Sequence, residues 1–341
     1  MSQSQTDHKI DPWFLENLAC PRDGEFLDQI RNKLVCSNGH SYPISRSTPV
    51  MLIPESPQTH EQLFQRTLDI VDGSDGRFTD SQEDDVLIAK ETVDPFVQEL
   101  IAGTNSNFYK HLTGKLKRYP IPKLPHPLGG YGEGTLLDVG CSWGRWCIAS
   151  ARSGYMPVGI DPSLEAILAA KRVAKQLGVT AKYLVADSRF LPFRRSIFDY
   201  VYSYSVFQHF DKQDVKDSLV QIAQVLKPDG ISMVQMLNQY GLRSKYVQLN
   251  RGLKEASGFE TRYWAPSELV ATFTQSIGPT DLLVGSFFTQ AQATDKDLLT
   301  LGGRAIVEVA ELLKRTTYRA PFLTKLADNL FLYSKSAKPI C

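Results

Sequence analysis

The chain has 341 residues, of which 42% are hydrophobic, and its 38 Lys and Arg against 37 Asp and Glu give a formal net charge of +1. That length suits one large domain or two smaller ones, and the near-neutral charge excludes the overall basic character of a dedicated nucleic-acid-binding protein. The five cysteines form no secreted disulfide framework, and no secretory signal or membrane-spanning apolar run is visible, so we expect a cytoplasmic chain.

The first compact unit is predicted at residues 10–54. Cys20, Asp23, Cys36 and His40 follow the spacing C-x2-D-x12-C-x3-H within it. Thiolate, carboxylate and imidazole groups at such separations are typical ligands of Zn²⁺ in a short knuckle. The alternative is a degenerate knuckle that only its apolar core holds together.

Residues 55–133 are predicted to form a linker and a helical cap. One helix is expected around Glu61–Val71, and residues 94–118 show apolar side chains at helical spacing. Residues 119–133 are rich in Pro and Gly, which favours an extended connection into the next domain.

A glycine-rich turn opens the third region, residues 134–341. The stretch L-L-D-V-G-C-S-W-G-R-W contains Asp138 at the end of an apolar strand, followed by Gly140 and Gly144. Glycine lets such a turn be tight and lets a ligand approach the backbone closely. The pattern D-x-G-x-x-x-G is neither the dinucleotide fingerprint nor a P-loop, which would carry Lys-Ser/Thr.

Further strands of this region also end in a carboxylate. Asp161 lies about twenty residues beyond the glycine turn, where an acid can accept hydrogen bonds from ribose hydroxyls, and Asp187 follows the next strand. A turn is expected at residues 227–230. The predicted strands are Thr135–Val139, Met156–Ile160, Ala181–Ala186, Phe198–Ser203 and Ile231–Met236, with helices over Trp146–Arg152, Leu164–Leu177 and Lys212–Val225.

The C-terminal part departs from simple strand–helix alternation. Insertions are predicted at residues 238–262 and 289–326, the first with a basic rim that suits either a substrate-side lid or a solvated helix. A strand-like segment is expected at Phe259–Trp264, and strands at Asp281–Phe288 and Asn329–Ser334 are expected to form an antiparallel hairpin. An amphipathic helix near Arg304–Lys314 is interpreted as a lid or as a contact in a homo-oligomer.

The order of these motifs over residues 134–240 resembles the class I S-adenosylmethionine-dependent methyltransferases. The resemblance implies an α/β fold with a seven-stranded, doubly wound Rossmann-like sheet and S-adenosylmethionine as cofactor. Matched position by position, the resemblance implies four groups of cofactor-binding residues. Those at the methionine end are Asp138, Gly140, Cys141 and Gly144, and those at the ribose are Asp161 and Pro162. Those at the adenine are Ala186, Asp187 and Ser188, and those at the floor of the pocket are Ser203 and Tyr204.

The N-terminal unit resembles the zinc-ribbon-like modules of rRNA guanine-N1 methyltransferases and of methyltransferase-activator proteins. The resemblance implies a Zn²⁺ site at Cys20, Asp23, Cys36 and His40. The sequence departs from the family pattern at Asp23, where the family has cysteine.

Methyl transfer to an oxygen, nitrogen or carbon atom of a small molecule is the function that the resemblance implies. His209, just past the fourth strand, is the candidate general base; the alternative is a histidine that orients the loop through a backbone hydrogen bond. The Asn/Asp-Pro-Pro-Tyr motif that grips planar exocyclic amines is absent. The alternatives are an RNA methyltransferase that uses the N-terminal unit to hold RNA, and a non-catalytic docking protein.

Overall fold

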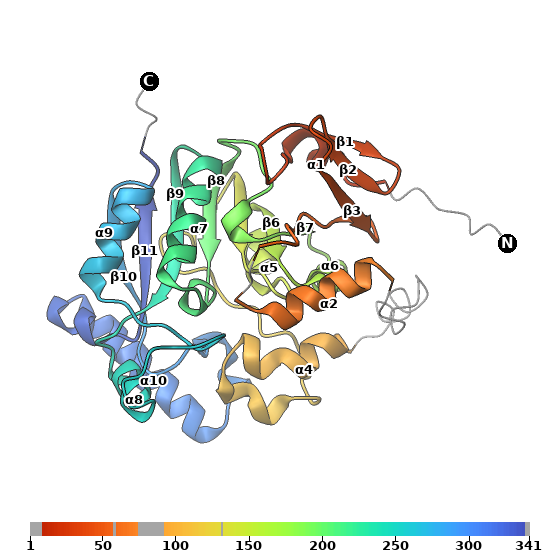
Figure 1. The fold of residues 1–341 in the computed structure, drawn as a ribbon. Helices are drawn as coiled ribbons and strands as arrows, with labels where there is room; N and C mark the ends of the chain where they lie inside the picture. The colour runs from red at the N-terminus through yellow and green to blue at the C-terminus, as the bar shows by residue number, and fades with distance from the viewer. Residues whose placement is uncertain (1–8, 57–58, 74–91, 131, 338–341) are drawn as a thin grey trace.

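The computed structural model describes residues 9–56, 59–73, 92–130 and 132–337, and a seven-stranded mixed sheet forms its centre (Figure 1). The strand order is β10-β11-β9-β8-β5-β6-β7. Strands β5 to β9 pair in parallel, whereas β11 is antiparallel to both β9 and β10. This confirms the predicted fold class and the C-terminal antiparallel hairpin. The strand bounds are β5 Thr135–Val139, β6 Met156–Asp161, β7 Lys182–Val185, β8 Phe198–Ser203, β9 Leu226–Leu237, β10 Thr280–Ser286 and β11 Asn329–Lys335.

Helices cover both faces of this sheet. Alternate residues of a strand point to opposite faces, and β5 shows the division: Leu136 packs with α5, whereas Leu137 shares a core with α7 and α9. Ser163 and Asp211 cap the first turns of α6 and α7 through their side chains. The covering helices are α5 Arg145–Arg152, α6 Leu164–Gln176, α7 Lys212–Val225 and α9 Pro266–Ser276.

The N-terminal residues form a four-stranded antiparallel sheet that packs on the large one (Figure 1). Its core residues, such as Leu34 and Tyr42, belong to the same apolar cluster as Leu137 of β5. Val50 pairs in parallel with Val185 at the end of β7. The small unit therefore continues the large sheet at its β7 edge. The division of the chain into domains at 10–54, 55–133 and 134–341 remains a prediction. The elements of the small unit are α1 Pro12–Asn17, β1 Leu27–Ile30, β2 Lys33–Cys36, β3 Ser41–Ser45 and β4 Thr48–Pro49.

Further helices gather at the carboxyl end of the parallel strands (Figure 1). Their residues contact this end directly: Trp143 Nε1 donates to Thr104 Oγ1 of α4, and Arg262 N donates to Gln208 O. None of the helices in the described part of the chain is long and apolar enough to cross a membrane. These elements are α2 Glu61–Val71, α4 Pro95–Thr104, η1 Asn107–Leu112, η2 Ser188–Phe190, η3 Phe207–His209, α8 Leu242–Asn250, η4 Ala293–Leu298, α10 Leu301–Thr317 and η5 Pro321–Leu326.

Three local predictions differ from the structure. The turn expected at 227–230 is wrong, because β9 already begins at Leu226 and the extra residues form a bulge opposite β8, with Asp229 at φ 63°. The strand-like segment expected at Phe259–Trp264 is a single bridge between Trp264 and Asn238. The amphipathic helix near Arg304–Lys314 is longer than expected and spans all of α10.

Candidate active site

The glycine-rich turn after β5 leaves no room for side chains. Gly140 has φ 75° and Gly144 has φ 80°, a region that other residues rarely adopt. A Cβ on Gly140 would overlap the side chain of Val206, and one on Gly144 would come within 2.7 Å of the Tyr183 hydroxyl. Both positions therefore require glycine, because the side chains of Val206 and Tyr183 pack directly against the turn.

Asp161, at the end of β6, lies beside this turn. Its Oδ2 accepts a hydrogen bond from Ser142 N at 3.0 Å, and its Oδ1 accepts one from Ser163 N at 2.9 Å. Burial raises the pKa of Asp161 to about 6 despite these two backbone donors. The carboxylate thus fastens the glycine turn to the start of α6 and still has lone pairs for a ligand.

Asp138, within β5, is buried with only part of its hydrogen-bonding capacity used. Cys147 Sγ donates to Oδ2 at 3.3 Å, whereas Oδ1 has no partner among the described residues. Burial raises the pKa of Asp138 to about 7. An orphaned buried carboxylate oxygen is costly, so this atom marks a place where a donor from a ligand would be stabilising.

Asp187, after β7, already has a cationic partner. Arg189 Nη2 lies 2.7 Å from Asp187 Oδ2, and Arg189 Nη1 lies 3.0 Å from Asp214 Oδ1 on α7. The neighbouring Ser188 hydroxyl shares a buried 2.9 Å hydrogen bond with Ser218. Arg189 was not predicted, since only the fold brings the second carboxylate, Asp214, to it.

The four predicted metal ligands converge at one corner of the small sheet. Their donor atoms all lie within 4.8 Å of one another. The sulfur atoms of Cys20 and Cys36 each lie 3.5 Å from His40 Nδ1, and Asp23 Oδ2 lies 2.9 Å from the same nitrogen. A tetrahedral zinc ion with bonds of about 2.3 Å to sulfur and about 2.0 Å to nitrogen separates those atoms by about 3.5 Å, so the donor set fits the ion.

A methyltransferase domain model matches residues 136–230. Among curated proteins, the chain is 27% identical over 197 residues to a ubiquinone biosynthesis O-methyltransferase of Brucella anthropi, covering 54% of this chain and 77% of that one. It is 30% identical over 162 residues to the Brucella ovis protein of the same name, covering 46% of this chain and 62% of that one. A solved S-adenosylmethionine-dependent methyltransferase of Methanosarcina mazei aligns with a TM-score of 0.46 and 18% identity, over 63% of this chain and 99% of that one.

The chain therefore contains a methyltransferase domain at residues 136–230. The matched region contains β5 to β8 and the start of β9, and so includes the glycine turn and all three acids. The chain spans only about three fifths of several curated relatives, such as the Brucella ovis protein, so their acceptor does not transfer to it as a fact.

The predicted cofactor residues of this domain lie together at the carboxyl end of the parallel strands. Val139 is in register with Ile160 and with Ser203, and Asp161 is in register with Val185, so the groups at these strand ends are neighbours. The Asp138 Oδ1, which has no partner among the described residues, fits a ligand donor at these strand ends. The individual roles remain predictions.

Several of the predicted residues contribute through the backbone or through packing. Cys141 is 2% exposed, and its sulfur lies under the turn, against the position that a Cβ on Gly159 would take. The Ser203 hydroxyl donates to Val139 O at 3.0 Å, and Ala186 N donates to Asp161 O at 3.2 Å. These bonds fix the spacing of the strand ends rather than offer side chains to a ligand.

The segment around Pro162 is held from outside the sheet. Pro162 O accepts a hydrogen bond from Thr67 Oγ1 of α2 at 2.9 Å, and the same hydroxyl accepts one from Leu164 N. Helix α2 therefore lies against the first turn of α6, beside Asp161. The bounds Glu61–Val71 predicted for this helix are confirmed.

His209, the predicted base, has both ring nitrogens engaged. Nδ1 lies 2.8 Å from Phe259 O, and Nε2 lies 3.1 Å from Gln208 Nε2. The ring stacks on Phe259 at 4.0 Å, and burial lowers the pKa of His209 to about 4. A neutral ring that donates from Nδ1 and accepts at Nε2 satisfies this geometry, which is what the alternative, a loop-orienting role, requires. The catalytic role stays a prediction.

A hydrogen-bonded chain of buried amide groups beyond β8 was not predicted from the sequence. Ser205 has φ 65° and donates its N–H to Gln235 Oε1 at 2.8 Å, while Gln235 Nε2 donates to Asn329 Oδ1 at 2.7 Å. Gln208 Nε2 donates to Ser205 Oγ, and Gln208 Oε1 is buried with no hydrogen-bond partner in the described part of the chain. The only signal in the sequence was a glutamine inside the apolar run of β9. These polar groups follow Ser203 and Tyr204, the predicted pocket floor, along the chain and in the neighbouring strands β9 and β11.

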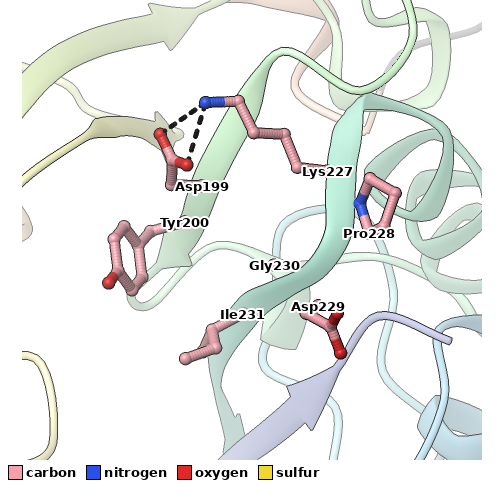
Figure 2. Close-up of a pocket in the computed structure, with 7 residues that line it drawn as sticks. All are labelled: Asp199, Tyr200, Lys227, Pro228, Asp229, Gly230 and Ile231. Atoms are coloured by element: carbon pink, nitrogen blue, oxygen red, sulfur yellow. Dashed lines mark hydrogen bonds and ion pairs between the residues drawn. The ribbon is translucent and has the colours of Figure 1, made fainter. Parts of the chain in front are cut away.

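A small cavity at the opposite edge of the sheet does not belong to this site. It measures about 150 Å³ and lies at the amino end of β8, beside the bulge of β9 (Figure 2). Lys227 Nζ lies 2.9 Å from both carboxylate oxygens of Asp199, as the dashed lines in Figure 2 mark, so both oxygens of this acid are paired. This pair therefore stabilises the bulge and is remote from the acids at the carboxyl edge.

Proposed function

We propose that this methyltransferase transfers the methyl group of S-adenosylmethionine to a small-molecule acceptor, with an oxygen atom as the first candidate. The observation that carries the proposal is the convergence of Asp138, Asp161 and Asp187 on one edge of the sheet, next to a turn that only glycine permits. When bound, S-adenosylmethionine supplies an electrophilic methyl group on its sulfonium. The work of the chain is then to bind, align and exclude water.

Each acid has a part in this binding. Asp161 accepts hydrogen bonds from the ribose hydroxyls through the lone pairs that Ser142 and Ser163 leave free. Asp187 accepts from the exocyclic amine of adenine. Because Arg189 has Asp214 as a second partner at 3.0 Å, it keeps an ion pair when Asp187 turns toward the ligand.

Two features favour a small acceptor over RNA. The curated relatives are named as O-methyltransferases of ubiquinone biosynthesis. Residues 10–54, which would have to hold RNA, contain four Lys and Arg against five Asp and Glu, a net charge of −1. A unit with this net charge offers phosphates no overall electrostatic attraction, whereas RNA-binding units carry basic patches.

We also propose that Cys20, Asp23, Cys36 and His40 bind one structural Zn²⁺ per chain. The 3.5 Å sulfur–nitrogen separations support this, as does the Tyr42 hydroxyl, which lies 3.1 Å from Cys20 Sγ and can orient that ligand. Replacement of the metal by Co²⁺ tests the donor set. Thiolate-to-metal charge-transfer bands and tetrahedral d–d bands are expected, and a protein that contains no metal and binds no Co²⁺ would refute the proposal.

Calorimetric titration with S-adenosylhomocysteine tests the cofactor assignment. Binding with one site per chain is expected, followed by methyl transfer to members of a panel of phenols, catechols and amines, measured from labelled S-adenosylmethionine. Failure to bind S-adenosylhomocysteine would instead favour the docking-protein alternative. Transfer to RNA with none to the small-molecule panel would contradict the acceptor class.

A further inference from the structure

Arg145 is a buried cation that forms no ion pair with any carboxylate in the described part of the chain. It is the first residue of α5, directly after Gly144, and it is 5% exposed. Its guanidinium carbon lies 5.5 Å from the centroids of both the Trp146 and the Tyr204 rings, and its Nη1 is buried with no hydrogen-bond partner among the described residues. Two aromatic faces therefore fix the guanidinium while one of its donors remains unused.

The nearby acids do not neutralise it. Asp295 accepts the Tyr109 hydroxyl at 2.6 Å and pairs with Arg118 at 3.4 Å. Asp138 interacts with Arg145 only through space, and its own Oδ1 has no hydrogen-bond partner within the described ranges. Burial lowers the pKa of Arg145, which shows that the fold disfavours the charge. A buried charge of this kind is strongly destabilising unless a partner compensates it.

The position of Arg145 selects the chemistry of that partner. The planar guanidinium matches the two oxygens of a carboxylate, and Trp146 and Tyr204 hold its plane. It borders the glycine turn, on the side where β8 ends in Ser203. The free Oδ1 of Asp138 adds an acceptor for an ammonium group next to a carboxylate.

We propose that Arg145 binds a ligand carboxylate, which belongs either to the amino-acid end of the cofactor or to an acidic acceptor. The inference rests on the proposed function, because both ligands belong to the methyl-transfer site. Arg145 then contributes to ligand selection, since a cofactor or acceptor that lacks the carboxylate leaves its guanidinium unpaired.

Paired ligands separate the two sources. S-adenosylhomocysteine carries the amino-acid carboxylate, whereas 5′-methylthioadenosine lacks the whole amino-acid part. With the protein saturated by S-adenosylhomocysteine, 3,4-dihydroxybenzoate and catechol differ only by a carboxylate. Each ligand is titrated into wild type, Arg145→Met, Arg145→Lys and the control Arg152→Met, which changes an exposed arginine at the other end of α5.

The expected result for a cofactor carboxylate is that Arg145→Met binds S-adenosylhomocysteine about tenfold or more weakly, with 5′-methylthioadenosine unchanged. For an acceptor carboxylate, only 3,4-dihydroxybenzoate loses affinity. Arg145→Lys should fall between Arg145→Met and wild type, because lysine keeps the charge and loses the fork. Unchanged 5′-methylthioadenosine binding shows that the variant is folded.

The inference is overturned if Arg145→Met binds S-adenosylhomocysteine as wild type does and 3,4-dihydroxybenzoate shows no dependence on Arg145. It is also overturned if S-adenosylhomocysteine and 5′-methylthioadenosine weaken by the same factor in both Arg145 variants. A wild-type protein that binds neither nucleoside refutes the cofactor assignment itself, which is a distinguishable outcome.

Discussion

Replacement of Asp161 by asparagine tests the cofactor edge at its best-defined carboxylate. The two oxygens of Asp161 each accept one backbone N–H, from Ser142 and from Ser163. Asparagine keeps the shape but has only one oxygen, so its amide nitrogen must face one of these two donors. We expect a loss of about 1–3 kcal/mol in the free energy of unfolding, the usual penalty for a buried donor left unpaired.

The same substitution should lower the affinity for the cofactor by more than its effect on the stability of the fold alone suggests. A charge-assisted hydrogen bond from a ribose hydroxyl is worth about 1.5–3 kcal/mol, which corresponds to a loss in affinity of about ten- to 150-fold. Part of any loss will come from the glycine turn, because Ser142 lies between Gly140 and Gly144. The measurement must therefore separate the ribose bond from the backbone bond.

A cycle with S-adenosylhomocysteine and its 2′-deoxy analogue makes that separation. In wild type the analogue should bind more weakly, because it lacks one hydroxyl donor. In Asp161→Asn this difference should shrink, since the carboxylate that distinguished the ligands is gone. Calorimetry gives all four affinities, and thermal unfolding reports the backbone effect. An equal preference for the 2′-hydroxyl in both proteins would refute the ribose assignment of Asp161.

Three further outcomes follow from the site. Burial raises the pKa of Asp138 to about 7, so the contribution of its protonated carboxyl group to the stability of the fold is complete below pH 4 and is lost as the pH rises through 7. The Tm of Asp138→Asn relative to that of wild type should therefore increase from pH 5 to 8, and a constant difference in Tm would contradict this. Cys36→Ser should remove Zn²⁺ and lower the Tm, whereas Asp23→Cys should bind the metal more tightly in chelator competition; equal metal contents in all three proteins would count against the proposed ligands. His209→Asn should keep turnover within about tenfold of wild type because both ring nitrogens are engaged, and a loss of about a hundredfold with unchanged S-adenosylhomocysteine affinity would establish His209 as the base.

The strands and their terminal acids were predictable because local pattern determines them. Apolar runs that end in Asp138 and Asp161 are visible in the sequence, and the observed β5 agrees with its predicted bounds. The bulge in β9 was not predictable, since Lys227-Pro228-Asp229-Gly230 has turn chemistry and only its pairing with β8 makes it part of a strand.

The hydrogen-bond and ion-pair partners of the site side chains could not be predicted from the sequence, for a different reason. Arg189 is only two residues from Asp187, but its second partner, Asp214, is 25 residues away, and the Phe259 carbonyl that binds His209 is 50 residues away. Hydrogen bonds between residues so far apart in the sequence depend on how the helices and loops pack against the sheet. The sequence places each titratable group at its strand end, whereas tertiary packing decides its pKa and its availability.

The contacts of the N-terminal unit connect its metal ligands to the cofactor edge. Met51 N donates to Val185 O at 2.8 Å on one side of the Asp187 segment, and Ala19 N donates to Pro192 O at 3.0 Å on the other. Ala19 directly precedes the metal ligand Cys20. A bound ion would therefore fix one of the two anchors of the segment that carries Asp187, the predicted adenine-side acid. With the proposed ion and the proposed role of Asp187, the small sheet would support cofactor binding structurally and would need no RNA, in agreement with the negative net charge of residues 10–54.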